Sequence, residues 1–497
     1  MAAWRGASAS TDRSFTINAG QTATFDIDSG STDLTLSGAS AASSGGLTKT
    51  GPGTLTLAGT HAYTGATAIT GGTLAIGNGG SGGSISTTSG VALSNNATIA
   101  FNQSSNAAFS PVISGAGSLV KDGSGALTVS GDNSFSGSTT VSGGTLVMGH
   151  ANALGNASNP VVLNAGTLNL NGNSLSVSSL SGGSAGRVSN SSASTTAILT
   201  ANAPGNSTFS GVIQDGSGSV GLTKSGVGSL TLAGANSYSG ATTVAGGTLV
   251  VNGSIQTNVS VAGGAFLGGS GTIGDAASVG RLSGAGTISP GSIAGAAGIL
   301  SAYTFNPSAG LGAAFEFTSA GLPDFTQPAN SRNDVLNLTS TVADPFAGSG
   351  LTSANAIDIY FNVNSILPGA TFTGGFYTNS VAGDGFMLFA PGDLSSAVAS
   401  ATYTYWVKSA GSGVRTFNGV NYDSFTSNVT LGAVGASLDG GLSSGFLTEF
   451  VVVPEPDTIA LAGLGIAMAA WSLWKRRRIA QLKTGTGTVS AKGGGVA

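Results

Sequence analysis

A 26-residue pattern that occurs three times without a gap constrains the fold of this 497-residue chain more than any other feature. The copies read GPGTLTLAGTHAYTGATAITGGTLAI from Gly51, GSGALTVSGDNSFSGSTTVSGGTLVM from Gly123 and GVGSLTLAGANSYSGATTVAGGTLVV from Gly226. With the Leu-x-Lys lead-in that precedes each copy, the repeats span 47–76, 119–148 and 222–251. Repeats of this kind are typical of architectures in which each unit stacks on the next.

Each copy contains two short alternating segments joined through glycine turns. In TLTL of the first copy, Leu55 and Leu57 point to one side of a strand and the threonines to the other. Strands this short are unstable alone in water, so we expect the units to pile up with leucine on leucine. The residues expected in the repeat core are Leu55, Leu57, Leu74, Leu127, Val129, Leu146, Leu230, Leu232 and Leu249. The turns, where positive φ favours glycine, are expected at Gly71, Gly72, Gly143, Gly144, Gly246 and Gly247.

The uneven spacing of the copies distinguishes an open solenoid from a closed ring. Their starts are 72 and then 103 residues apart, whereas a propeller needs similar blades of about 40–50 residues. An open solenoid requires only that each coil fit its neighbours. The sequence therefore predicts a parallel β-helix over 31–300, preceded by a β cap at 1–30, with on the order of a dozen coils of ~20–25 residues.

Composition supports a folded β-rich chain and disfavours several classes of function. Charged residues make up 7% of the chain, compared with about 25% in a usual soluble domain, and the net charge is only −4. Since 40% of the residues are apolar, the chain is not expected to be disordered. The mild acidity gives no electrostatic reason to expect nucleic acid. Without cysteine, and with only His61 and His150, no metal or cofactor is predicted.

An enzyme of the polysaccharide lyase or hydrolase type would need carboxylates clustered on one face of the helix. Between residues 47 and 300 the acids are few: Asp122, Asp132, Asp215 and Asp275. The cations are Lys49, Lys121, Lys224, Arg187 and Arg281, and the three lysines occupy one position of the repeat. We therefore predict no catalytic residue, no small-molecule substrate and no enzymatic activity.

The sequence pattern changes in the region 301–453. Its strands are longer and more aromatic, as in AIDIYFNV from Ala356 and ATYTYWVKS from Ala401. Proline and glycine punctuate between them, which is typical of strands joined by turns. We expect an antiparallel, sandwich-like β region here, because the last coil of a solenoid exposes an apolar end and an unpaired strand edge.

The end of the chain predicts one membrane span. Residues 458–474 contain no charge, and a helix of this length reaches ~25 Å, at the short end of what crosses a bilayer. Trp471 and Trp474 lie near the basic end, where interfacial indoles are favoured. The cations expected to stop transfer and stay in the cytoplasm are Lys475, Arg476, Arg477 and Arg478. Residues 479–497 read as a flexible cytoplasmic tail.

The repeated core resembles the passenger-associated transport repeat, also called the autotransporter-associated β-strand repeat. FSGVIQDGSGSVGLTKSG (209–226) resembles the usual lead-in, and GGSGTIGDAASVGRLSGAGTISPGS (268–292) the coil that commonly follows. The resemblance covers roughly 45–340 of the chain. It implies a right-handed parallel β-helix on a secreted or surface-displayed protein, and it implies no catalytic activity.

The end of the chain closely resembles the PEP-CTERM sorting signal. The match consists of Val453, Pro454, Glu455 and Pro456, then the span 458–474, within a sorting segment 454–478. It implies recognition by exosortase in a Gram-negative bacterium, cleavage near the Pro-Glu-Pro turn, and a transient inner-membrane anchor before release or attachment at the surface. It also implies association with the exopolysaccharide matrix. The nineteen residues after Arg478 depart from the family, whose chains usually stop within a few residues.

Two alternatives and one missing feature accompany this interpretation. Ladders of threonine and serine, with exposed aromatic residues such as Tyr63 and Tyr238, would make a carbohydrate-binding surface. Packing of these tyrosines beside their turns is the simpler expectation. An autotransporter-type passenger would need an outer-membrane barrel, for which the roughly 150 residues after the solenoid are few. Export requires a signal peptide, yet the first residues show no apolar signal segment. We therefore expect the true start of the chain to lie upstream.

Overall fold

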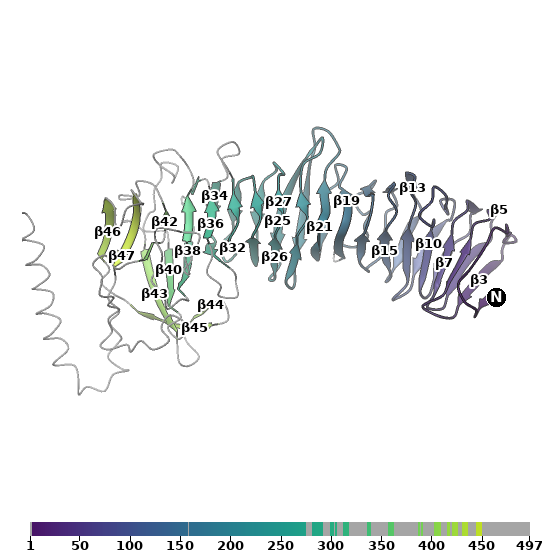
Figure 1. Ribbon diagram of the computed structural model, residues 1–497, viewed down its shortest axis with the longest axis horizontal. Coiled ribbons are helices and arrows are strands. Elements are labelled where there is room, and N and C mark those ends of the chain that lie inside the picture. The colour runs from purple at the N-terminus through teal and green to yellow at the C-terminus, as the bar shows by residue number, and fades with distance from the viewer. Residues whose placement is uncertain are drawn as a thin grey trace, which may run out of the picture.

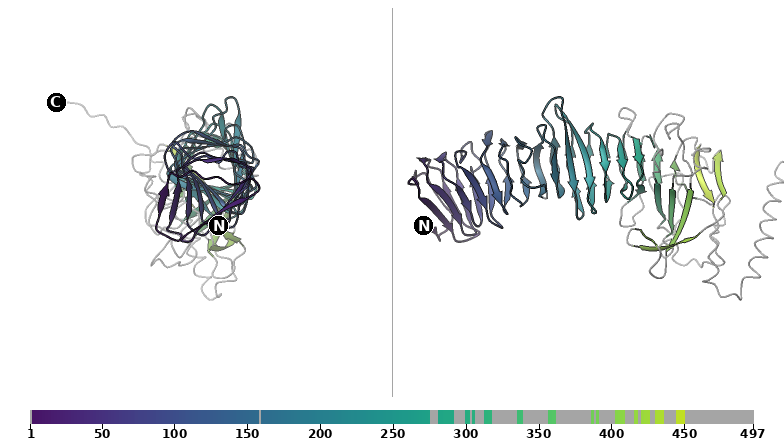
Figure 2. Two further views of the ribbon diagram at one scale, coloured as in Figure 1. Left: turned by 90° about the vertical axis from the view of Figure 1, so that its right-hand side faces the viewer. Right: turned by 180° about the vertical axis from the view of Figure 1, so that it is seen from behind.

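The computed structural model shows an all-β rod in which short strands stack coil upon coil along one axis (Figure 1). It describes residues 2–157, 159–274, 281–291 and 299–302, and beyond these only strands between Thr304 and Glu449. The rod is a parallel β-solenoid of about 13 turns, which confirms the predicted class. Seen down the rod, the coils superimpose on one another (Figure 2).

The largest sheet is long and continuous. Its strands are β2 (Ala9–Thr11), β4 (Asp33–Leu36), β7 (Thr54–Leu57), β10 (Thr73–Ile76), β12 (Thr98–Phe101), β13 (Ala107–Phe109), β15 (Ser118–Lys121), β16 (Ala126–Val129), β17 (Thr139–Val141), β18 (Thr145–Met148), β19 (Pro160–Asn169), β21 (Ser179–Ser189), β23 (Ser207–Phe209), β24 (Val212–Ile213), β26 (Ser229–Leu232), β29 (Thr248–Val251), β32 (Phe266–Gly269), β35 (Thr287–Pro290), β38 (Gly312–Phe317), β40 (Ala356–Phe361), β43 (Thr402–Lys408), β44 (Arg415–Phe417) and β45 (Val420–Phe425). The sheet covers two faces of the rod because β19 pairs with β17 through its first half and with β18 through its second half.

The remaining strands form shorter sheets on the other sides of the rod. The N-terminal one contains β1 (Ala2–Trp4), β3 (Thr22–Ile27), β6 (Gly46–Thr50), β9 (Thr67–Ile69), β11 (Gly90–Leu93) and β14 (Val112–Gly115). A seven-stranded one contains β20 (Leu175–Val177), β22 (Thr196–Asn202), β25 (Ser219–Ser225), β28 (Thr242–Val244), β31 (Val259–Val261), β34 (Arg281–Gly284) and β37 (Thr304–Phe305). A six-stranded one contains β27 (Ala235–Asn236), β30 (Ser254–Ile255), β33 (Thr272–Ile273), β36 (Ile299–Ala302), β39 (Val335–Leu338) and β42 (Phe389–Ala390). A two-stranded sheet pairs β5 (Ser40–Ser43) with β8 (His61–Tyr63). A three-stranded sheet contains β41 (Phe386–Met387), β46 (Thr430–Gly435) and β47 (Ser444–Glu449).

The inside of the coils is one continuous apolar core that runs from Ile17 to Leu300. Alternation explains it, because every second residue of a strand points inward and stacks on its counterpart one coil away. One inward column passes in register through Leu34, Leu55, Leu74, Ile99 and Leu119. The core therefore grows with coil number and needs no single large globule.

The three repeats begin on different faces of the rod. Lys49, in the lead-in of the first copy, pairs with Ile69 of β9 one coil on. Lys121, its counterpart in the second copy, pairs in the same way with Val141 of β17. On its other side it pairs with Phe101 of β12, which stacks on β10 of the first copy. The 72 residues that separate the starts of the two copies are therefore not a whole number of coils. Equivalent side chains of different copies do not lie above one another.

Parallel stacking extends beyond the boundary that the sequence places at residue 301. Strand β38 pairs in parallel with β35, β40 with β38, and β43 with β40. The antiparallel pairs among the described strands come later, between β43 and β45, β44 and β45, β46 and β47, and β41 and β47. A change in composition does not reveal a strand's partner, so the sequence set the boundary of parallel pairing too early. A sandwich in 301–453 stays a prediction.

Candidate functional site: the repeat corners and the sorting segment

The leucines assigned to the repeat core lie inside the coils. The two leucines of each copy, 19 residues apart in sequence, pair directly in the parallel register. The assigned core residues are at most 1% exposed: Leu55, Leu57, Leu74, Leu127, Val129, Leu146, Leu230, Leu232 and Leu249. Burying each such side chain stabilises the fold by roughly 1.5–3 kcal/mol.

The glycine pairs lie at the turns that lead into the second strand of each copy. The second glycine of each pair has a left-handed backbone, with φ of 62° at Gly72, 60° at Gly144 and 61° at Gly247. A Cβ added at Gly72 would also lie 2.3 Å from the carbonyl oxygen of Gly53 in the coil below. Both the conformation and the close approach of the coils therefore require glycine here. Gly71, Gly143 and Gly246 precede them at the same turns.

The lysine of each lead-in is fully buried and holds two successive turns together. Lys224 Nζ donates hydrogen bonds to the carbonyl oxygens of Ser225 at 2.6 Å, Gly226 at 3.0 Å and Gly246 at 3.0 Å. Lys49 makes the same three contacts, with Thr50 at 2.7 Å, Gly51 at 2.9 Å and Gly71 at 3.2 Å.

Lys121 repeats the arrangement with the carbonyl oxygens of Gly123 and Gly143. The three side chains are 0–1% exposed. No described carboxylate lies within ion-pair distance of any of them. We call this arrangement the lysine clamp.

Burial and the backbone carbonyls shift the pKa of the clamp lysines in opposite directions. Burial lowers the pKa of Lys49 and Lys224 to about 8, with Asp26 partly opposing the effect at Lys49. Burial also lowers the pKa of Lys121, against the attraction of Asp122. Carbonyl oxygens accept hydrogen bonds from the ammonium form and so favour it. The sequence showed that the lysine belongs to the repeat, but an apolar alternation rule does not place a cation inside.

The aromatic residue of each copy is buried as well. Tyr63, Phe135 and Tyr238 are all 0% exposed. The Tyr63 hydroxyl shares a hydrogen bond with Thr67 Oγ1 at 2.8 Å, and Tyr238 does the same with Thr242 Oγ1 at 2.7 Å. The alternative in which these tyrosines form an exposed carbohydrate platform is therefore wrong, because they pack beside their own turns.

A polar residue two positions before the aromatic links neighbouring coils. Asn133 Oδ1 accepts from the Ile113 amide at 2.7 Å, and its Nδ2 donates to the Ala153 carbonyl at 2.6 Å. Asn236 likewise accepts from the Ile213 amide at 2.9 Å and donates to the Ser254 carbonyl at 2.9 Å.

The first copy has His61 at this position, 1% exposed and stacked on Phe15 with ring centroids 5.1 Å apart. Neither ring nitrogen of His61 has a hydrogen-bond partner among the described residues. Burial lowers the pKa of His61 to about 4. His61 is thus a core residue.

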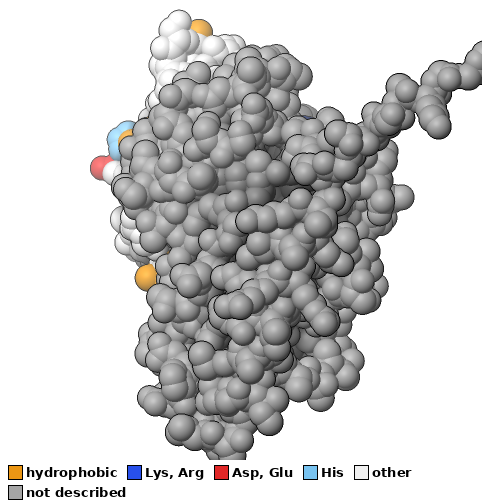
Figure 3. All heavy atoms as spheres, turned by 90° about the vertical axis from the view of Figure 1, so that its left-hand side faces the viewer, with side chains coloured by type: hydrophobic (Ala, Val, Ile, Leu, Met, Phe, Trp, Pro, Cys, Tyr) orange, Lys and Arg blue, Asp and Glu red, His pale blue; other side chains and the backbone are white. Residues whose placement is uncertain are grey.

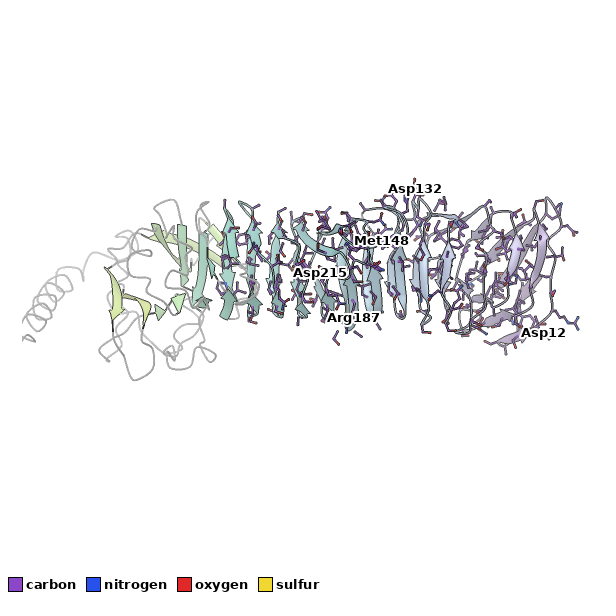
Figure 4. The ribbon with its side chains drawn as sticks, turned by 90° about the horizontal axis from the view of Figure 1, so that it is seen from above. Asp12, Asp132, Met148, Arg187 and Asp215 are labelled. Carbon is purple, nitrogen blue, oxygen red and sulfur yellow. The ribbon has the colours of Figure 1, made fainter. Side chains whose placement is uncertain are left out.

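Charged residues are sparse along the described rod. Residues 34–274 contain seven charged residues, of which three are the clamp lysines. The other four are Asp122, Asp132, Arg187 and Asp215, and the last three occur singly along the rod (Figure 4). Within the described residues, no three His, Asp or Glu side chains gather as metal ligands. Viewed from the C-terminal side, the described atoms at the rim are mostly backbone or uncharged polar groups (Figure 3).

The sorting residues predicted from the sequence lie outside the described residues. These are Val453, Pro454, Glu455, Pro456, Lys475, Arg476, Arg477 and Arg478. The span 458–474 and the tail 479–497 lie outside them too. In the part of the chain that the structure describes, no helix is long and apolar enough to cross a membrane.

Comparison with known families finds matches for the repeats and for the C-terminal segment. The model of the passenger-associated-transport-repeat matches residues 47–76, 119–148 and 222–251, the three segments that contain the lysine clamps. The PEP-CTERM protein-sorting motif matches residues 452–478. No curated protein matches the chain. The sorting motif indicates exosortase-dependent sorting of an exported surface protein in a Gram-negative bacterium, with processing and membrane anchoring at the C-terminus.

Proposed function

We propose that this protein is a non-enzymatic structural rod of the cell surface, released from or retained at the envelope by exosortase cleavage near Pro454–Pro456. The observation that supports it most strongly is the sorting motif at 452–478, which follows a solenoid with buried repeat residues. A parallel solenoid gives reach, because each coil adds about 4.8 Å of length with the same local contacts. Such a rod presents long side faces rather than a pocket.

The low surface charge supports a structural role in a hydrated matrix. Catalysis of glycoside cleavage needs two carboxylates held about 5–10 Å apart. Over residues 34–274 the acids are Asp122, Asp132 and Asp215, and none of them contacts another acid among the described residues. Instead, the outward positions are filled mainly by threonine, serine, asparagine, alanine and glycine. We propose that the rod associates with exopolysaccharide outside the cell.

Processing is tested by comparing intact mass and location in cells with and without exosortase. In exosortase-containing cells the wild-type chain should lose the mass of its C-terminal segment and leave the inner-membrane fraction. The triple change Pro454→Ala, Glu455→Ala, Pro456→Ala should retain full mass in that fraction. Asp457→Asn, a neighbouring change outside the tripeptide, serves as the control and should be processed like wild type. Equal mass and equal location of the wild-type chain in both strains would contradict the proposal.

The non-enzymatic part is tested separately with the purified chain. Incubation with the host's own exopolysaccharide should release no reducing ends above the buffer level. Release that disappears when Asp132 or Asp215 is changed to Asn would place the protein among the polysaccharide-degrading solenoids instead.

A further inference from the structure

One side of the rod presents an unbroken column of hydroxyl side chains over six successive coils. The column lies on the seven-stranded sheet that contains β25 and β34 (Figure 1). In-register pairing joins its members in one line: Ser176, Thr200, Thr223, Thr243, Ser260 and Ser283. Their strand neighbours point into the core, so these residues point outward. We call this column the hydroxyl ladder.

Within the part of the chain that the structure describes, the hydroxyls of the ladder are not used by the fold. None of the six has a side-chain hydrogen bond to another described residue. Near the N-terminal end of the solenoid, some hydroxyls are used within the chain, as where Thr50 donates to Asp26 at 3.0 Å and Thr56 to Asp33 at 3.0 Å. Each ladder hydroxyl therefore keeps one donor and two acceptor positions for a partner outside the chain.

The neighbouring face lacks such a column. In the same coils, its outward column runs in register through Thr208, Thr231, Val250 and Gly268. The column therefore loses its hydroxyls after two coils, because valine is apolar and glycine has no side chain. Over these coils the unbroken column is therefore confined to one face. A shorter column of four hydroxyl residues, Thr54, Thr73, Thr98 and Ser118, lies on the long sheet nearer the N-terminus.

The ladder is bordered by small and apolar side chains rather than by charges. On one side the outward residues are Ile198 and Gly221, in register with each other, and Ala241 follows one coil on. Ile198 is 44% exposed and is one of three exposed large hydrophobic residues in the described chain. An apolar strip beside a line of hydroxyls matches a sugar ring, which has apolar C–H faces and polar hydroxyl edges. The lack of charge favours a neutral polymer over an acidic one.

We propose that the hydroxyl ladder binds an extended neutral polysaccharide that runs along the rod axis. The proposal rests on the proposed function, since it names the face through which the rod meets the matrix. Parallel strands repeat every 4.7–4.9 Å, which is of the order of one sugar ring, so each coil offers a hydroxyl to successive rings of an extended chain. Single contacts of this kind are weak, but six in one line act on one polymer with the advantage of multivalency.

The test measures retardation of the purified full-length chain in gels that contain neutral dextran, neutral hydroxyethyl cellulose or acidic alginate. Wild type should be retarded by at least one neutral polymer and not by alginate. Changing Thr200, Thr223 and Thr243 together to Val removes three central hydroxyls while keeping β-branched side chains of the same shape. This variant should bind about tenfold more weakly or worse, as expected when several hydrogen bonds are lost. Changing the same residues to Ser should restore binding.

The matched control changes three threonines in neighbouring coils of the other face, Thr208, Thr231 and Thr248, to Val. It should bind like wild type, because its hydroxyls are not part of an unbroken column. Equal binding by wild type and the ladder variant, equal loss in the control, or no retardation of wild type by any neutral polymer would overturn the proposal. So would sedimentation that shows wild type pairing through this face and the ladder variant monomeric. Exosortase-dependent processing of the ladder variant should be unchanged, so failure of the ladder and failure of the sorting proposal are distinguishable.

Discussion

The repeat copies 47–76 and 119–148 share a backbone but satisfy their buried polar groups differently. In the first copy Tyr63 bonds to Thr67, whereas neither ring nitrogen of His61 has a hydrogen-bond partner among the described residues. In the second copy Asn133 links the coils on both sides, whereas Phe135 brings no hydroxyl to Thr139, whose Oγ1 is buried without a partner among the described residues. Each of these copies thus lacks one polar link.

The third copy, 222–251, shows what a complete corner contains. Asn236 bonds to both neighbouring coils, and Tyr238 bonds to Thr242. The difference between copies teaches that leucine stacking sets the coil, while the polar links can be lost one at a time without changing it. What all three copies keep is the lysine clamp. The clamp should therefore contribute more to stability than either of the links.

Removing a clamp is the strongest test of that comparison. Lys224→Met keeps the buried stem but leaves three carbonyl oxygens without their donor. Unsatisfied buried polar groups cost about 1–3 kcal/mol each, so we expect a loss of about 3 kcal/mol in the free energy of local opening. Hydrogen exchange read by mass spectrometry over 219–251 measures it coil by coil, which suits a solenoid whose unfolding need not be two-state.

The matched control for the clamp is Arg187→Met, an exposed cation of the same rod. It should change exchange by less than about 0.5 kcal/mol. Protection in Lys224→Met equal to or above that of wild type would show that the ammonium costs more to bury than its three hydrogen bonds return.

Acid should weaken the first copy and not the third. The pKa of His61 falls from 6.5 in the unfolded chain to about 4 in the folded one, because the buried ring resists charging. The unfolded state therefore binds more protons between these values, and stability falls as the pH drops from about 6.5 to about 4. We expect His61→Asn to remove this dependence and to stabilise the coils around 40–63 by about 1–2 kcal/mol, since asparagine supplies the links seen at Asn133 and Asn236.

Exchange measured at several pH values over peptides from 15–63 and 226–251 tests this expectation. His150→Asn, at an exposed position, should leave the slope unchanged. An equal pH slope in His61→Asn and wild type would remove His61 as its source.

The sequence predicted the stacking of the repeats well because alternation has a strict consequence. A strand with leucine at every second position has one apolar side, so Leu55 could stack only inward, and its 19-residue distance to Leu74 fixed the register within a copy. Alternation puts Lys49 on the same side of β6 as Leu47, but a rule built on apolar residues does not place a cation in the core, which is why the burial of Lys49 could not be derived. A lysine repeated in three copies beside glycine was the only signal of the clamp.

The relation between copies could not be predicted because it depends on the lengths of the coils between them. The coils there vary in length, so neither the face on which Lys121 lies nor the column formed by Thr223 and Thr243 follows from the repeat pattern. The sorting segment is the opposite case. Its charge-free run and flanking cations define it in the sequence alone, and the motif at 452–478 supports it without any structure.

The smallest expected effect comes from repairing the corner of the second copy. Phe135→Tyr adds one hydroxyl at a 0% exposed ring and should bring it to Thr139 Oγ1, as Tyr63 and Tyr238 reach their threonines. A new buried hydrogen bond contributes about 1 kcal/mol, so exchange over 119–148 should slow by about fivefold. The gain should vanish when Thr139→Val is also present, since the partner oxygen is then absent. The converse change, Tyr238→Phe, should cost about as much in the third copy, because it leaves Thr242 in the state of Thr139. If Phe135→Tyr instead loosens the coil, the ring cavity of the second copy is too tight for an added oxygen, and the three corners are not interchangeable.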